Sequence, residues 1–166
     1  MKTVVVGLGN PILGDDGVGW RIVEYYQRAV AESYSSHDNV DFICLSVGGL
    51  SLMEHMAGYD RAILLDAVNL GKLPPGDIYC LSLADLPNYM AGHTGSAHDT
   101  SLATALQLGI AMGISLPEEI LVIGVESPNV NDFSEQLSPP VEAAIPRAAF
   151  ILKGLLRNKY EALISR

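Results

Sequence analysis

The first nineteen residues constrain the fold of this chain more than any other stretch. A β-branched run at residues 3–6 leads into the glycine-rich turn Gly7-Leu8-Gly9-Asn10-Pro11-Ile12-Leu13-Gly14, which ends in Asp15 and Asp16. The apolar spacing after Asp16 predicts an amphipathic helix, so this is the opening strand–turn–helix unit of an α/β protein. A phosphate-binding turn presents bare backbone N–H groups at the helix N-terminus. Two carboxylates stand there instead, and they suit a cation.

The rest of the chain alternates between strand-like and helix-like segments. We expect further strands at residues 40–47, 62–66, 77–82 and 120–125. Further helices are expected over about 50–57, from Asp99 or Thr100 to Gly113, and from Ser138 onward with a kink or restart at Pro146. This order predicts one domain over residues 1–166, a three-layer α/β/α sandwich. Its five-stranded, twisted, mostly parallel sheet would carry helices on both faces.

Composition excludes several classes of function. The 166 residues are 49% hydrophobic and carry a net charge of −9, which is unsuited to a nucleic acid backbone. No apolar run approaches the roughly 20 residues that span a bilayer, and Met1-Lys2-Thr3 does not open a signal peptide. Cys44 and Cys80 lie in strand-like runs outside any CxxC pattern, so we expect reduced, structural thiols. We therefore expect a cytoplasmic protein with no nucleic acid or membrane partner. The sequence carries no signal of oligomeric state, and a monomer is the default expectation.

Three polar segments are expected to meet at the carboxyl edge of the sheet, where α/β proteins bind ligands. They bring Asp16 from the first loop, Asp66 from the end of the third strand, and His98 from the loop before a helix, with His93 as a rival. Together, two carboxylates and one imidazole would suit a divalent transition metal. Each residue also has a structural interpretation: Asp15 or Asp16 as a helix cap, Asp66 as an Asx-turn residue, and His98 as an exposed loop residue.

The same residues resemble a known family, the [NiFe]-hydrogenase maturation endopeptidases. The resemblance is carried by the motif from Gly7 to Gly19, by Gly48-Gly49, by Leu64-Leu65-Asp66-Ala67-Val68 and by Ser96-Ala97-His98-Asp99. It continues through Gly124-Val125-Glu126 and Leu137-Ser138-Pro139. Where many members have Glu, this chain has the shorter Asp16, and where Thr and a further Gly often follow Gly48-Gly49, it has Leu50 and Leu52.

The resemblance implies an endopeptidase that recognises the nickel-loaded precursor of the hydrogenase large subunit. Such an enzyme removes a C-terminal peptide, and the nickel belongs to the substrate, so no organic cofactor is expected. By position, Asp16, Asp66 and His98 would contact the nickel, with Asp16 and Asp66 as the catalytic carboxylates.

Other functions remain open from the sequence. No GxSxG or HExxH motif occurs, so neither a serine elbow nor a zinc helix is indicated. A nickel-binding chaperone without protease activity would use the same three residues. The GLGNP opening is shared with peptidyl-tRNA hydrolase, but Ile12 stands where that esterase needs Gly. A nucleotide-binding module would need a third glycine in the first turn and an acid after the second strand, where Ser46-Val47 stand.

Overall fold

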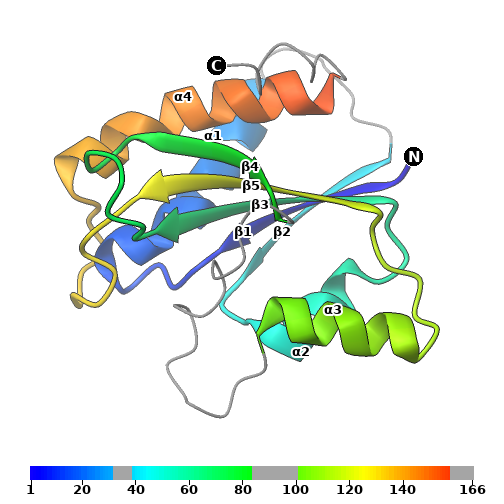
Figure 1. Ribbon diagram of the computed structural model, residues 1–166. Helices are drawn as coiled ribbons and strands as arrows, with labels where there is room; N and C mark the ends of the chain where they lie inside the picture. The colour runs from blue at the N-terminus through cyan, green and yellow to red at the C-terminus, as the bar shows by residue number, and fades with distance from the viewer. Residues whose placement is uncertain (32–38, 84–100, 158–166) are drawn as a thin grey trace.

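The β-branched run that opens the chain forms a strand inside a five-stranded sheet with the order β2-β1-β3-β5-β4 (Figure 1). The computed structural model describes residues 1–31, 39–83 and 101–157. The strands are β1 (Thr3–Leu8), β2 (Val40–Leu45), β3 (Arg61–Val68), β4 (Ile78–Ser82) and β5 (Glu119–Glu126). β2, β1, β3 and β5 are parallel, and only the edge strand β4 runs antiparallel to its neighbour. The predicted mostly parallel sheet is confirmed.

Helices cover both faces of this sheet, as the sequence predicts (Figure 1). α1 (Val18–Ala31) and α4 (Pro139–Leu156) pack together on one face, and α2 (Gly49–Met56) and α3 (Leu102–Ala111) on the other. A short 3-10 turn, Gly14–Gly17, precedes α1. None of the helices that the structure describes is long and apolar enough to cross a membrane.

The core consists of two apolar clusters, one on each side of the sheet. Along β3, Ile63, Leu65 and Ala67 join the cluster under α1 and α4. The alternate residues Leu64 and Val68 join the cluster under α2 and α3. Successive side chains of a strand point to opposite faces, so Asp66 points to the same face of the sheet as Leu64 and Val68. The third strand thus delivers its carboxylate toward the α2 and α3 layer.

Several element boundaries differ from the expected ones. α3 has Ser101 as its N-cap, whose side chain accepts a hydrogen bond from the Thr104 N–H at 3.2 Å. Asp99 and Thr100, the expected caps, lie outside the described residues. α4 follows Ser138 as predicted, but it does not restart at Pro146, which lies within one helix.

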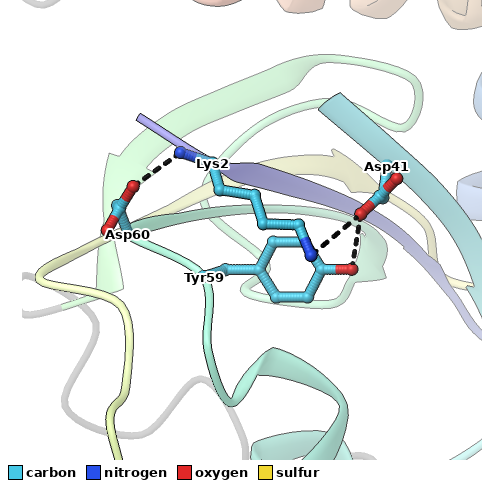
Figure 2. Close-up of polar contacts among 4 residues, drawn as sticks. All are labelled: Lys2, Asp41, Tyr59 and Asp60. Atoms are coloured by element: carbon cyan, nitrogen blue, oxygen red, sulfur yellow. Dashed lines mark hydrogen bonds and ion pairs between the residues drawn. The ribbon is translucent and has the colours of Figure 1, made fainter. Parts of the chain in front are cut away.

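The amino end of the sheet is held by a polar cluster of four residues (Figure 2). The Lys2 N–H donates to the Asp60 carboxylate at 2.6 Å, and the Lys2 ammonium lies 3.5 Å from the Asp41 carboxylate. The Tyr59 hydroxyl donates to Asp41 at 2.8 Å, and its ring lies 4.3 Å below the Lys2 nitrogen. This cluster joins β1, β2 and the turn before β3 at the end opposite to their carboxyl ends.

Candidate active site

In the turn after β1, the Asp16 carboxylate folds back and accepts a hydrogen bond from the backbone of the same turn. The Asn10 N–H donates to Asp16 Oδ2 at 2.6 Å. Gly9 has a left-handed φ of 110°, and a Cβ there would lie 1.8 Å from the Asp16 carbonyl oxygen. The turn therefore requires glycine because two backbone segments meet closely. Because the Asp16 carboxylate already accepts the hydrogen bond of a backbone N–H in this turn, that N–H is not available to a phosphate. This agrees with the prediction that the turn is not a phosphate-binding loop.

Asp15, adjacent in sequence, has a structural role. Its side chain is 1% exposed, and its two oxygens accept hydrogen bonds from the Ser138 N–H at 2.6 Å and the Ser138 hydroxyl at 2.8 Å. Ser138 is the N-cap of α4 but makes no side-chain capping bond within that helix. Asp15 thus joins the first loop to the start of α4. It is not the N-cap of the first helical turn, because that position is Leu13 and no side chain caps it.

Asp66 was expected to emerge from the end of the third strand, and this expectation was wrong. β3 continues to Val68, and Asp66 is 0% exposed within it. The strand continues because residues 61–68 pair fully with β5, opposite Gly124 at Asp66. On the other side, the pairing of β1 with β3 ends at Gly7 and Leu65. Asp66 is thus the first residue of β3 that does not pair with β1. The turn that follows β1 and Asp66 line a common cavity.

Asp16 and Asp66 line the same cavity, which has a volume of about 440 Å³. The residues that line it come from the first turn, the segment after β2 and β3: Leu8, Gly9, Asn10, Leu13, Asp16, Ser46, Val47, Gly48, Ser51 and Asp66. Asp16 and Asp66 are the two acids among these described lining residues. Carboxylate oxygens are common ligands of divalent cations. Asp16 and Asp66 thus line one cavity, and their roles in it stay a prediction.

The structure also adds polar groups that sequence reasoning did not select. Ser46 donates through its hydroxyl to the Gly9 carbonyl oxygen at 2.8 Å, which ties the end of β2 to the first turn. Asn10 and Ser51 line the same cavity. The position of Ser46, directly after a strand in a parallel sheet, is the signal that could have identified it.

Of the histidines, the structure describes His55 but neither of the two candidate ligands. His98 and its rival His93 lie outside the described residues, so their place relative to Asp16 and Asp66 stays a prediction. Within the described ranges, no group of three or more His, Cys, Asp or Glu residues could hold a metal ion. His55 is exposed on α2, with Nδ1 2.7 Å from the Ser51 carbonyl oxygen.

The two cysteines are poor nucleophiles. Both are free and half-buried, Cys44 in β2 and Cys80 in β4. Burial raises the pKa of the Cys44 thiol, and the nearby Glu24 raises it further. Burial also raises the pKa of Cys80, although the Arg61 charge opposes this. The thiols therefore stay protonated at neutral pH, and neither resembles an activated thiolate.

The family comparison decides among the remaining alternatives. A family model described as hydrogenase maturation protease, HycI, matches residues 21–153. The chain belongs to the hydrogenase maturation protease family. It is 30% identical to the hydrogenase 2 maturation protease of Escherichia coli K12, over 98% of this chain and 96% of that protein. It is also 30% identical to the hydrogenase expression/formation protein HupD of Rhizobium leguminosarum bv. viciae, over 99% of this chain and 79% of that protein.

Solved structures agree with this assignment. The hydrogenase maturating endopeptidase HybD from E. coli superposes with a TM-score of 0.77 at 27% identity, covering 96% of this chain and 94% of that one. This hydrogenase maturation protease is therefore a peptidase with the fold of its relatives. The comparisons support neither a nucleotide-binding module nor a peptidyl-tRNA hydrolase, and they give no support to a chaperone without protease activity.

Proposed function

We propose that this hydrogenase maturation protease cleaves the C-terminal peptide from a nickel-loaded large-subunit precursor, with Asp16, Asp66 and His98 contacting the nickel of the substrate. The observation that carries the proposal is that Asp16 and Asp66, fifty positions apart, line one cavity at the carboxyl edge of the sheet. His98 enters from the family resemblance alone. The cytoplasmic location and the monomeric state expected from the sequence stay predictions.

The donor set suits this chemistry. Carboxylate oxygens bind divalent cations, and an imidazole shifts the preference toward borderline transition metals such as nickel. A substrate that brings its own cation would offer these carboxylates a metal to bind. Recognition would then depend on the metal, because a precursor without nickel lacks that ligand contact.

Hydrolysis of the peptide bond needs a water molecule and a base that takes its proton. We assign that base to one of the two carboxylates, which takes a proton as the water oxygen attacks the scissile carbonyl carbon. The proton then passes to the leaving amine as the C–N bond breaks. The other carboxylate orients the substrate, and His98 serves as a ligand. No serine or cysteine nucleophile takes part.

The direct experiment compares nickel-loaded and nickel-free precursor by mass spectrometry of the products. We expect a short C-terminal peptide to be lost only from the nickel-loaded form, even with abundant enzyme. A thiol-blocking reagent should have little effect on the rate. Efficient cleavage of the nickel-free precursor, or inactivation that follows modification of Cys44 or Cys80, contradicts metal-directed cleavage.

The carboxylates are tested by replacement with alanine. Asp16→Ala and Asp66→Ala should each abolish cleavage while the protein remains folded, because each variant removes one of the two carboxylates assigned to metal contact and water activation. Glu118→Ala is the control, since Glu118 is an exposed acid beside the amino end of β5. Normal cleavage by both aspartate variants would show that the site is elsewhere.

The two loop histidines are separated by parallel variants. His98→Ala should weaken metal engagement strongly, and His93→Ala only mildly, as judged by titration of each variant with a divalent metal. A larger loss in His93→Ala would reverse the assignment.

A further inference from the structure

Two exposed apolar side chains lie beside the cavity of Asp16 and Asp66, outside its wall. Phe133 is 88% exposed and Ile12 is 47% exposed, and neither lines the cavity. A single exposed apolar side chain needs no explanation. These two come from segments that are more than a hundred residues apart in sequence but are joined by backbone hydrogen bonds.

Their proximity follows from backbone pairing. Leu13 and Ser134 form an isolated parallel bridge, so the backbones of Ile12 and Phe133, one step back along each segment, are also close. The Ser134 N–H donates to the Ile12 carbonyl oxygen at 3.1 Å, and the Gly14 N–H donates to the Ser134 carbonyl oxygen at 2.7 Å. Segments paired in this way lie about 4.8 Å apart. We refer to the two side chains as the Ile12–Phe133 patch.

The patch is joined firmly to the turn that carries Asp16. The Asp15 N–H donates to the Asn129 carbonyl oxygen at 3.1 Å, and the Asp15 carboxylate binds Ser138. A Cβ at Gly14 would lie only 3.1 Å from the Asn129 carbonyl oxygen, so the loop of residues 128–138 packs directly on the turn. A group bound at the patch would therefore be placed at a fixed position relative to Asp16.

We propose that the Ile12–Phe133 patch is the docking surface for the folded body of the substrate precursor, with Phe133 inserted into an apolar pocket of that protein. This inference rests on the proposed function. The occupant follows from position: the patch lies outside the cavity that would receive the scissile segment, so its partner is another part of the same substrate. Aromatic side chains are enriched at protein interfaces. Binding at such a point would hold the precursor on the enzyme while its C-terminal segment enters the cavity.

The test uses Phe133→Ser in the full chain with nickel-loaded precursor. Because Phe133 is 88% exposed, the variant should fold and melt like wild type. We expect KM and the dissociation constant for the precursor to rise about tenfold or more, with kcat unchanged, since a contact equal in ground and transition states is lost. Phe133→Leu should recover most of the affinity.

Phe150→Ser is the matched control. Phe150 is 74% exposed on α4, the helix that covers the sheet face away from the α2 and α3 layer, and its loss should leave KM unchanged (Figure 1). If Phe133→Ser binds and cleaves the precursor as well as wild type does, the docking surface is wrong and the proposed function is unaffected. Binding that depends on Phe133 without cleavage would support the docking surface and contradict the proposed function. Failure of wild type to bind the precursor would overturn both.

Discussion

At the scale of single residues, two adjacent carboxylates have different tasks. Asp16 lines the cavity, whereas Asp15 is buried and accepts two hydrogen bonds from Ser138, 123 positions away. The side chains are chemically identical, so only their surroundings distinguish them. The Asp-Asp pair therefore combines a structural residue, Asp15, with a residue that lines the candidate site, Asp16.

We predict graded losses of stability when the Asp15–Ser138 contact is weakened. Asp15→Ala removes the acceptor of both bonds and should cost about 3 kcal/mol of unfolding free energy. Asp15→Asn retains one carbonyl acceptor and should cost about half as much, and Ser138→Ala, which loses only the hydroxyl bond, about 1 kcal/mol. Urea unfolding measures these values. Equal stability of Asp15→Ala and the exposed-acid variant Glu135→Ala would show that the contact contributes nothing.

At the scale of elements, the edge strand β4 is held by a buried carboxylate. Glu126, at the end of β5, is 3% exposed and accepts hydrogen bonds from the Tyr79 hydroxyl at 2.6 Å and the Gly71 N–H at 3.0 Å. Burial raises the pKa of Tyr79 from 10.0 to about 12, and the hydrogen bond to Glu126 adds to this effect. The neutral phenol is therefore the form that supports the β4–β5 edge.

This shift predicts a loss of stability at high pH. A group whose pKa is raised on folding contributes its full stability below its unfolded pKa, and loses it as the pH rises through the folded value. The contribution of Tyr79 should thus be constant below pH 10.0 and disappear by about pH 12. The difference in phenolate absorbance between wild type and Tyr79→Phe isolates this one tyrosine. A midpoint near 10 in that difference would refute the prediction.

The end of α4 depends on one buried cation. Arg61, at the start of β3, is 3% exposed, donates to the Leu155 carbonyl oxygen at 2.9 Å, and pairs with Glu119 of β5. A cation at a helix C-terminus also interacts favourably with the helix dipole. We predict that Arg61→Met destabilises the protein by about 2 kcal/mol, because a charged donor to a buried carbonyl is lost. Glu119→Gln should cost less than about 1 kcal/mol, since that side chain is 45% exposed. Thermal unfolding of both variants tests this order.

At the scale of the whole molecule, the layers meet most closely through glycines. A Cβ on Gly19, in the first turn of α1, would lie 2.2 Å from the Leu65 carbonyl oxygen and 2.4 Å from that of Leu8. A Cβ on Gly7 of β1 would lie 2.7 Å from the Gly19 carbonyl oxygen. Gly7 and Gly19 therefore serve helix-to-sheet contact, and that contact helps to set the position of the turn carrying Asp16.

We predict that Gly19→Ala destabilises the protein by at least about 3 kcal/mol, because backbone carbonyls of two strands cannot move aside as a side chain would. Gly48→Ala is the comparison, since nothing lies within 4 Å of a Cβ there and its φ of −134° suits any residue. It should change stability by no more than about 1 kcal/mol, as expected for alanine at a helix N-cap. A similar loss in both variants would contradict close packing as the cause.

The sequence by itself determined the alternation of strands and helices, the parallel sheet, the resemblance to the protease family and the choice of Asp16 and Asp66. These features depend on hydrophobic period, glycine and proline punctuation and motif order, which are local properties of the chain. Only the tertiary structure decided that Asp15 binds Ser138, that Asp66 is enclosed within β3, and that the segments carrying Ile12 and Phe133 pair. Each of these depends on which distant segment packs against a residue, because strand pairing and loop contact over a hundred positions leave no periodic signal in the sequence.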